Sequence, residues 1–190
     1  GHHFPGITLV VVIDADAGLF SADFRGQEQM AQTIVQVAGR AGRAELGGEV
    51  LIQSRHASHS TLQALSTLPY ADFARQLLDA RREAELPPFS HLALLRSEAR
   101  SLTQSLEFLD QAARLAAGLA SQHQLKVTCL GPVPSPMEKR AGRFRAQLSI
   151  SSSERGALQK QLALLIAELD QIKTPAGLRW SLDVDPLDMV

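Results

Sequence analysis

The segment Gln36-Val37-Ala38-Gly39-Arg40-Ala41-Gly42-Arg43 has the pattern Q-x-x-G-R-x-G-R, around which the first part of the chain is arranged. On a helix, Gln36, Arg40 and Arg43 stand at i, i+4 and i+7, so their side chains share one face. A separate apolar stripe, suited to packing on a core, is formed by Met30, Ile34 and Val37. Each of the two glycines costs about 1 kcal/mol relative to alanine inside a helix. The segment therefore favours a helix end whose backbone approaches a neighbour or a phosphate closely.

The two arginines suit a polyphosphate ligand, because a guanidinium is always charged and binds phosphate oxygens bidentately. The octapeptide resembles motif VI of the superfamily 2 helicases. The resemblance implies that Arg40 and Arg43 are catalytic, as arginine fingers that reach ATP bound to another lobe. It also implies that Gln36 and Gly39 join them in binding the nucleotide. The alternative interpretation is a solvated basic helix with a chance pair of glycines.

Residues 7–13, Ile-Thr-Leu-Val-Val-Val-Ile, are apolar on both faces and rich in β-branched side chains. This composition predicts a strand buried in a parallel sheet. Asp14 and Asp16 follow the strand, at the edge where α/β sheets place their ligand sites.

Residues 1–16 resemble motif V of the PriA family of superfamily 2 DNA helicases, and residues 19–25 resemble the same family. Motif V and motif VI follow in the order of that family. The resemblance implies that Gly1, His2 and His3 contact the DNA backbone. The adjacent histidines also raise the question of a metal site, but no carboxylate or cysteine lies at ligand spacing. We therefore expect no metal at these residues.

The composition is that of a globular protein, with 45% hydrophobic and 21% charged residues in 190. A formal net charge of −1 means that any nucleic-acid surface must be a local patch. The single cysteine, Cys129, excludes an internal disulfide and a multi-cysteine zinc cluster. No apolar run has the length of a membrane span and no signal peptide is evident, so we expect a cytoplasmic protein without a membrane partner.

Three parts are predicted along the chain: the end of a second helicase lobe at residues 1–59, a helical connector at 60–88, and a C-terminal DNA-binding domain at 89–190. Residues 49–54 are predicted to form a further strand of the lobe. The connector has helical periodicity that Pro69 interrupts, which indicates two helices. The pair Pro87-Pro88 ends the second of them and marks a domain boundary.

The third part shows the β-α-β-β-α-β pattern of a ferredoxin-like domain. Its strands are predicted at residues 91–96, 126–130, 144–151 and 178–185. A capping box at Ser101 begins the first helix, whose apolar stripe runs from Leu102 to Ala120. Ser152 or Ser153 is predicted to cap the second helix. Together with the resemblance to helicases, which implies the end of a RecA-like lobe with a parallel sheet, the expected fold class is α/β followed by helices and an α+β, ferredoxin-like domain.

A basic segment, residues 131–145, lies between the two middle strands of this domain, and we name it the basic hairpin. Its first half is stiffened by three prolines, and its second half carries Lys139, Arg140, Arg143 and Arg145 against one acid, Glu138. Such a segment suits contacts with sugar and phosphate that do not depend on base sequence. The alternative is a solvated hairpin tip. The basic hairpin and residues 180–186 also resemble the C-terminal domain of the PriA family, which implies DNA binding by these four cations.

The resemblances imply the C-terminal part of an ATP-dependent 3′→5′ DNA helicase that recognises stalled or branched replication forks and initiates primosome assembly. Forked and single-stranded DNA, single-stranded DNA-binding protein and other primosome proteins are the implied partners. ATP and Mg²⁺ are the implied cofactors, with zinc held outside these residues. No phosphate loop G-x-x-x-x-G-K-[ST] is present, so we expect the chain to be a fragment that hydrolyses no ATP alone.

Two alternatives remain open at the level of sequence. One is another ATP-driven member of the helicase superfamily, such as a translocase acting in repair. The other is a free-standing nucleic-acid-binding or adaptor module without ATPase chemistry.

Overall fold

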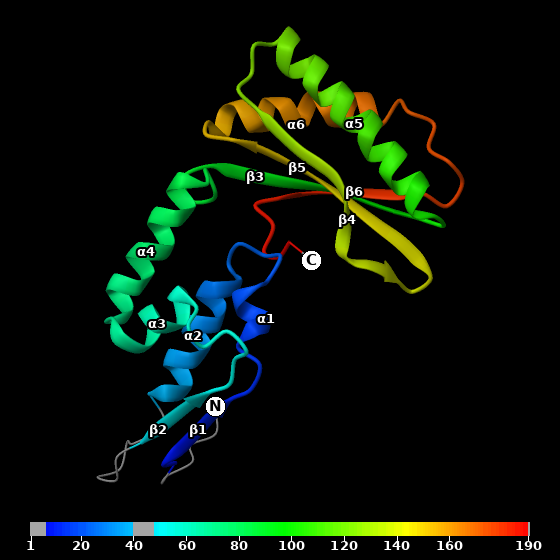
Figure 1. Ribbon diagram of the computed structural model, residues 1–190. Coiled ribbons are helices and arrows are strands. Elements are labelled where there is room, and N and C mark those ends of the chain that lie inside the picture. The colour runs from blue at the N-terminus through cyan, green and yellow to red at the C-terminus, as the bar shows by residue number, and fades with distance from the viewer. Residues whose placement is uncertain (1–6, 40–47, 190) are drawn as a thin grey trace. The chain divides into compact units, whose positions relative to one another are not determined.

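The computed structural model describes residues 7–39 and 48–189, and the chain divides into two compact units. Unit 1 is Gly1–Ala80 and unit 2 is Arg81–Val190 (Figure 1). This division falls inside a helix, eight residues before the boundary predicted at residues 88 and 89. The roles of lobe, connector and DNA-binding domain stay predictions. Within the described ranges, no helix is both long enough and apolar enough to cross a membrane.

Unit 1 is built on a parallel strand pair, β1 (Leu9–Val12) and β2 (Glu49–Ile52), with Leu9 opposite Glu49. Its helices are α1 (Asp16–Leu19), α2 (Gly26–Ala38), α3 (Ser60–Thr67) and the start of α4 (Tyr70–Glu83). The predicted parallel pairing is confirmed, and so is the break between two helices at Pro69.

The β1–β2 pair is covered on one face only by the described residues. Val10 and Val12 are half-buried, whereas Leu9, Val11 and Leu51 are about half exposed, at 50%, 53% and 47%. The expectation of burial on both faces is therefore not met within the described ranges, because α1 and α2 pack against a single side. A small core of Ala15, Leu19 and Leu62 lies there, with Met30 and Ile52 against it.

Helix α2 carries the predicted apolar stripe, since Ile34 is buried and Met30 and Val37 are half-buried. Gln36 lies on the exposed face, as the helical spacing predicts. The helix packs closely on the segment before it because Gly26 has no side chain. A Cβ atom at Gly26 would lie 2.2 Å from Cβ of Ser21.

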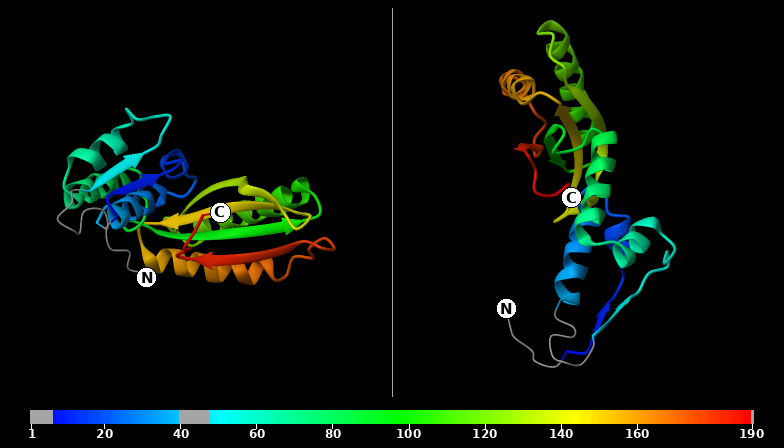
Figure 2. Two further views of the ribbon diagram at one scale, coloured as in Figure 1. Left: turned by 90° about the horizontal axis from the view of Figure 1, so that it is seen from below. Right: turned by 90° about the vertical axis from the view of Figure 1, so that its left-hand side faces the viewer.

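Unit 2 has the predicted β-α-β-β-α-β order. It consists of β3 (His91–Ala99), α5 (Leu102–Gln122), β4 (Thr128–Arg140), β5 (Arg143–Ser152), α6 (Arg155–Leu169) and β6 (Arg179–Val184). The sheet order is β4-β5-β3-β6 and all three pairings are antiparallel. Both helices lie on one face of the sheet (Figures 1 and 2). This topology confirms the ferredoxin-like prediction.

The core of unit 2 lies between the sheet and the two helices. Alternate residues of β5, namely Ala146, Leu148 and Ile150, are fully buried there. Four leucines of α6 face them: Leu158, Leu162, Leu165 and Leu169. Ser101 caps α5 as predicted, its hydroxyl accepting from the Gln104 amide at 3.3 Å. The buried side of α5 includes Leu109 and Ala116 of the predicted stripe, with Phe108 and Ala112 buried beside them.

Two predictions for unit 2 are wrong. Strand β4 is 13 residues long and includes most of the segment predicted as a loop, so the basic hairpin is two strands joined at Ala141 and Gly142. β4 lies at the sheet edge and has register shifts, where proline, which has no N–H, is tolerated. The cap of α6 is Glu154 rather than a serine. Ser152 instead donates to the Lys126 carbonyl at 2.6 Å, which ties β5 to the start of β4.

The face of the sheet opposite the helices is partly covered by the C-terminal tail. The Asp185 amide donates to the Leu92 carbonyl at 2.9 Å, and Pro186 is fully buried. The Arg96 guanidinium, 15% exposed, lies 2.7 Å from an Asp183 carboxylate oxygen and donates to the Asp188 carbonyl at 2.8 Å. Arg96 therefore anchors the tail to the middle of the sheet.

Candidate nucleic-acid interface

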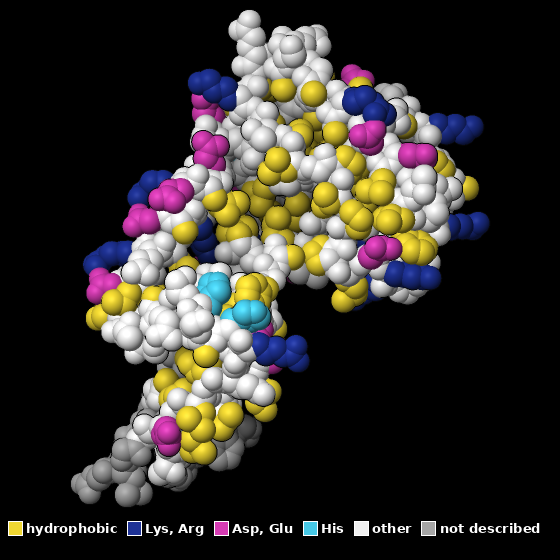
Figure 3. Space-filling view, viewed as in Figure 1, with side chains coloured by type: hydrophobic (Ala, Val, Ile, Leu, Met, Phe, Trp, Pro, Cys, Tyr) yellow, Lys and Arg dark blue, Asp and Glu magenta, His cyan; other side chains and the backbone are white. Residues whose placement is uncertain are grey.

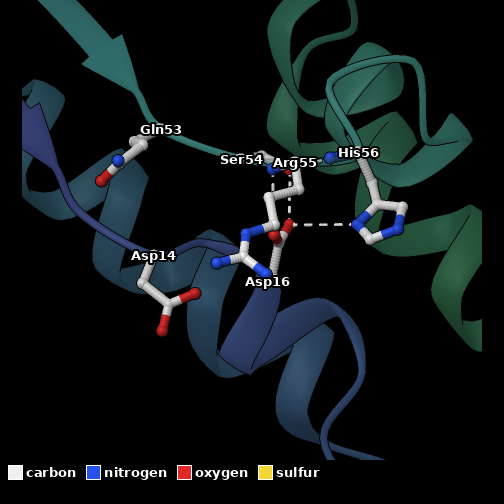
Figure 4. A pocket seen from close by; sticks show the side chains of 6 residues that line it. All are labelled: Asp14, Asp16, Gln53, Ser54, Arg55 and His56. Carbon is white, nitrogen blue, oxygen red and sulfur yellow. Dashed lines mark hydrogen bonds and ion pairs between the residues drawn. The ribbon is translucent and has the colours of Figure 1, made fainter.

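At the carboxyl ends of β1 and β2 lies an open pocket of about 510 Å³ (Figure 4). It is lined by Asp14, Asp16, Gln53, Ser54, Arg55 and His56. The position is the one that the sequence predicts for a ligand site, because both strands of a parallel pair end at the same edge. Asp14 and Asp16 are expected there from the sequence. The three residues after Gln53 are not, since nothing in their local pattern places them beside Asp16.

The Asp16 carboxylate organises this edge. It accepts a hydrogen bond from the Ser54 hydroxyl and another, at 2.9 Å, from the Arg55 amide. An imidazole nitrogen of His56 lies 3.6 Å away. The Ser54 hydrogen bond, followed by the Arg55 amide, lowers the pKa of Asp16 below its ordinary value. Asp16 is therefore a carboxylate, rather than a proton donor, near neutral pH, and its hydrogen bonds fix the backbone that follows β2.

An exposed aromatic side chain, Phe20, stands beside this pocket. Its ring packs edge-on against two imidazoles, with the ring centroids 4.8 Å apart for His56 and 5.7 Å apart for His59. Phe20 is 56% exposed. His59 also caps α3, because its ring nitrogen accepts from the Thr61 amide at 3.2 Å. The three rings hold the loop between β2 and α3 in place.

Several predicted site residues fall outside the described ranges: Gly1, His2, His3, Arg40 and Arg43. Gln36 and Gly39 are described, on the exposed side and at the C-cap of α2. Gly39 has a right-handed backbone conformation, with φ of −64°, and the described helix ends at Ala38. The structure thus places Gln36 and Gly39 as the sequence predicts, while their roles stay predictions.

The basic hairpin brings its four cations to one end of the sheet of unit 2, but it does not present them equally. The Lys139 ammonium lies 4.8 Å from the centre of the Phe144 ring, and Arg140 is exposed. Arg143 donates to the Gly177 carbonyl at 2.6 Å. Arg145 is 11% exposed and lies 3.4 Å from a Glu98 carboxylate oxygen. Lys139, Arg140 and Arg143 therefore remain available to a ligand, and Arg145 is held in the sheet.

Two further features bear on cofactors. Residues 7–39 and 48–189 hold no group of three or more His, Cys, Asp or Glu side chains placed to bind a metal ion. Burial raises the pKa of the Cys129 thiol, which leaves it a poor nucleophile and a poor metal ligand.

The fold of unit 2 and its basic edge are those of a compact α+β domain with a positively charged end. Residues 82–187 match the family "Primosomal protein N C-terminal domain". The chain belongs to the PriA family of replication restart proteins, because this family model covers more than half of its 190 residues.

Three of the similar proteins are each named replication restart protein PriA. The Haemophilus influenzae protein is 40% identical over 189 residues, covering 100% of this chain and 25% of its own length. The Rickettsia conorii protein is 35% identical and the Bacillus subtilis protein 34%, covering 98% and 100% of this chain. The chain spans about a quarter of the length of the relatives it matches.

Proposed function

We propose that the chain acts as the C-terminal part of an ATP-dependent 3′→5′ DNA helicase that recognises stalled or branched replication forks. In that protein it helps to initiate primosome assembly in the cytoplasm. Membership of the PriA family and the names of the relatives support this proposal. Single-stranded DNA-binding protein and other primosome proteins are the proposed protein partners.

In this proposal, unit 1 contributes the residues that contact the nucleotide. Arg40 and Arg43 act as arginine fingers on ATP and Mg²⁺ held by another lobe, with Gln36 and Gly39 beside them. The described edge of β1 and β2 could assist nucleotide binding but could not hold the phosphates by itself. It offers Asp14, Asp16 and the Arg55 guanidinium, but no glycine-rich phosphate loop. Gly1, His2 and His3 are proposed to contact the DNA backbone. A structural zinc would be held elsewhere in the longer protein, since the chain has one cysteine.

The basic hairpin is the observation that carries the DNA-binding role of unit 2. Its positive side chains stand out in a chain whose formal net charge is −1. Arg140 is exposed and forms no ion pair among the described residues, and neither do Lys139 and Arg143. Cations that are not neutralised by the protein favour a polyanionic partner, and phosphate contacts of this kind do not read base sequence.

A salt titration tests the DNA-binding role. Fluorescent single-stranded and forked DNA are titrated with the 190-residue chain and with Lys139→Gln/Arg140→Gln/Arg143→Gln. The slope of log affinity against log salt should become shallower by about 2, because each single-strand phosphate contact contributes about 0.7. Binding should weaken equally for DNA of different sequence.

The matched control is Arg114→Gln/Lys126→Gln/Lys160→Gln. It removes the same charge from exposed sites elsewhere in unit 2 and should leave the slope close to that of the wild type. If the hairpin variant keeps the wild-type slope while circular dichroism shows it folded, DNA does not bind the basic hairpin.

A further inference from the structure

Three connections of unit 2 meet at one end of its sheet. They are the turn from β3 into α5, the β4–β5 turn, and the connection from α6 into β6. The register requires this meeting, since Ala99 lies opposite Phe144 and Glu98 lies opposite Arg179. Two views of the ribbon agree in placing the three connections together (Figures 1 and 2). Residues distant in sequence thus share this end with the basic hairpin.

Gly177 is the point at which two of these connections meet the hairpin. Its carbonyl accepts the hydrogen bond from Arg143 at 2.6 Å. The Arg100 side chain packs beside Gly177, with its Nε 3.3 Å from the position that a Cβ atom would occupy. Gly177 has a φ of +88°, a conformation that glycine adopts without strain. Two guanidinium groups from separate segments therefore converge on one residue, and the hairpin is tied to its neighbours.

Positive charge dominates this end of the sheet. Arg100 and Arg179 are exposed and, within the part of the chain that the structure describes, neither pairs with a carboxylate. Glu98 is flanked by Arg145 on one neighbouring strand and Arg179 on the other, and it pairs with Arg145. Lys and Arg side chains project from this edge in Figure 3, at the right of the view. With Glu138 of the hairpin counted beside Glu98, two acids stand against six cations, which leaves the region with excess positive charge. The six cations are Arg100, Lys139, Arg140, Arg143, Arg145 and Arg179.

The start of α5 adds to this positive field. The helix has 21 residues and no acidic side chain in its first turn, so the positive end of its dipole is not neutralised locally. Its cap, Ser101, directly follows Arg100. The aromatic residues nearby are already engaged: Trp180 stacks on Phe108 at 6.3 Å, and Phe144 is covered by Lys139. Recognition here therefore has to use charge and hydrogen bonds rather than base stacking.

We propose that Arg100 and Arg179 extend the basic hairpin into one continuous surface for the sugar-phosphate backbone of DNA, with Gly177 holding Arg143 through its carbonyl and leaving room for Arg100 where a side chain would stand. This inference rests on the proposed DNA-binding role of the basic hairpin. DNA is favoured over an acidic peptide because the cations are spread over three connections, which suits a regularly charged backbone. Contacts from three directions also fix how the backbone crosses the end of the sheet.

The test uses Arg100→Gln/Arg179→Gln in the 190-residue chain, with Lys126→Gln/Lys160→Gln as the control of equal charge. Both control lysines are exposed, and Lys126 lies at the opposite end of the sheet. Titrating fluorescent forked and single-stranded DNA over a range of salt concentrations gives the slope for each variant. For the arginine variant, the slope of log affinity against log salt on single strands should become shallower by about 1.4, at about 0.7 per contact. The control should keep a slope close to that of the wild type.

The outcomes separate this inference from the function on which it rests. If the hairpin variant flattens the slope but Arg100→Gln/Arg179→Gln does not, DNA binds the hairpin alone and the inference is overturned. If neither variant changes the slope, the DNA-binding role itself fails. A labelled polyglutamate peptide is titrated in parallel. The arginine variant could lose affinity for the peptide while its salt dependence of DNA binding stays that of the wild type. That result would assign the surface to acidic protein segments and overturn the inference.

Discussion

The Nε atom of Arg145 lies 3.4 Å from Oε1 of Glu98, directly across the β3–β5 ladder. The Arg145 side chain is 11% exposed, against 39% for Glu98. A cation held in this way already has its counter-charge, and moving it to a DNA phosphate would break an interaction within the sheet. Among the four cations that the sequence assigns to DNA binding, Arg145 is thus the one that the fold engages most.

We expect Arg145→Gln to lower the free energy of unfolding by about 1 kcal/mol, because Glu98 then loses its partner in a partly shielded position. Urea denaturation is measured for the wild type, Arg145→Gln, Glu98→Gln and the double variant. The four free energies of unfolding give the coupling energy between Glu98 and Arg145. The salt slope for DNA should change less for Arg145→Gln than for Arg143→Gln. Equal flattening by the two variants, without loss of stability in Arg145→Gln, would instead show that Arg145 is a DNA contact.

The architecture of unit 2 could be predicted from sequence because its signals are local. Polar and apolar residues alternate along β5 and β6, and the leucines of α6 recur at helical spacing. Ser101 lies where a capping box places it, and the structure confirms the cap. These patterns depend on neighbouring residues only, so they determine the order of the elements and, through the ferredoxin-like pattern, the topology.

The errors and omissions arise where the deciding partner is distant in sequence. Prolines near Pro134 suggest a loop, but an edge strand tolerates them because one side of β4 pairs with no other strand of the sheet. The convergence of Arg100 and Arg143 on Gly177 depends on the α6–β6 connection, which no local pattern reveals. The contact of Ser54 with Asp16 spans 38 residues in sequence for the same reason.

A buried glutamine in α6 gives a test of core energetics. Gln161 is fully buried and donates to the Ala116 carbonyl at 2.8 Å, while its Oε1 has no hydrogen-bond partner among the described residues. Replacing both polar groups by a side chain of similar volume removes an unsatisfied acceptor. Gln161→Leu should leave the free energy of unfolding unchanged or raise it by up to about 1 kcal/mol.

The control for that change is Gln161→Ala, which leaves a cavity and should lower the free energy of unfolding by roughly 2 kcal/mol. Both variants are compared with the wild type by urea denaturation, followed by circular dichroism. A Gln161→Leu variant as unstable as Gln161→Ala would mean that the hydrogen bond to Ala116 contributes more than the unsatisfied oxygen costs.

The stability of the edge formed by β1 and β2 should depend on pH through the ionisation of Asp16. Its pKa is lowered in the folded protein, chiefly by the Ser54 hydrogen bond, relative to an unfolded value of about 3.9. The stabilisation that Asp16 contributes is therefore present above that unfolded value and is lost as the pH falls through the folded pKa. Ser54→Ala should raise the pKa of Asp16 toward its ordinary value.

Carbon-13 NMR of the Asp16 carboxyl group during an acid titration measures this shift directly. The stability difference between the wild type and Ser54→Ala should be present at pH 6 and smaller at pH 3, where Asp16 is more protonated in both. Thr61→Ala, which removes a hydroxyl from the neighbouring helix α3, is the control and should leave the Asp16 titration unchanged. An Asp16 pKa unaffected by Ser54→Ala would assign the lowering to the Arg55 amide instead.

The last prediction concerns the arginines of the Q-x-x-G-R-x-G-R segment in the longer protein. If Arg40 and Arg43 act on charge that develops during phosphoryl transfer, Arg40→Ala or Arg43→Ala should lower ATP turnover by roughly 10³-fold or more and weaken ATP binding much less. DNA-stimulated ATPase rates and nucleotide affinity are measured on the same preparations. Gln32→Ala, on the exposed face of α2 one turn before Gln36, provides a control that should keep the wild-type rate. Wild-type turnover in both arginine variants would mean that the segment is a solvated basic helix and that the charge on the γ-phosphate is stabilised by other residues.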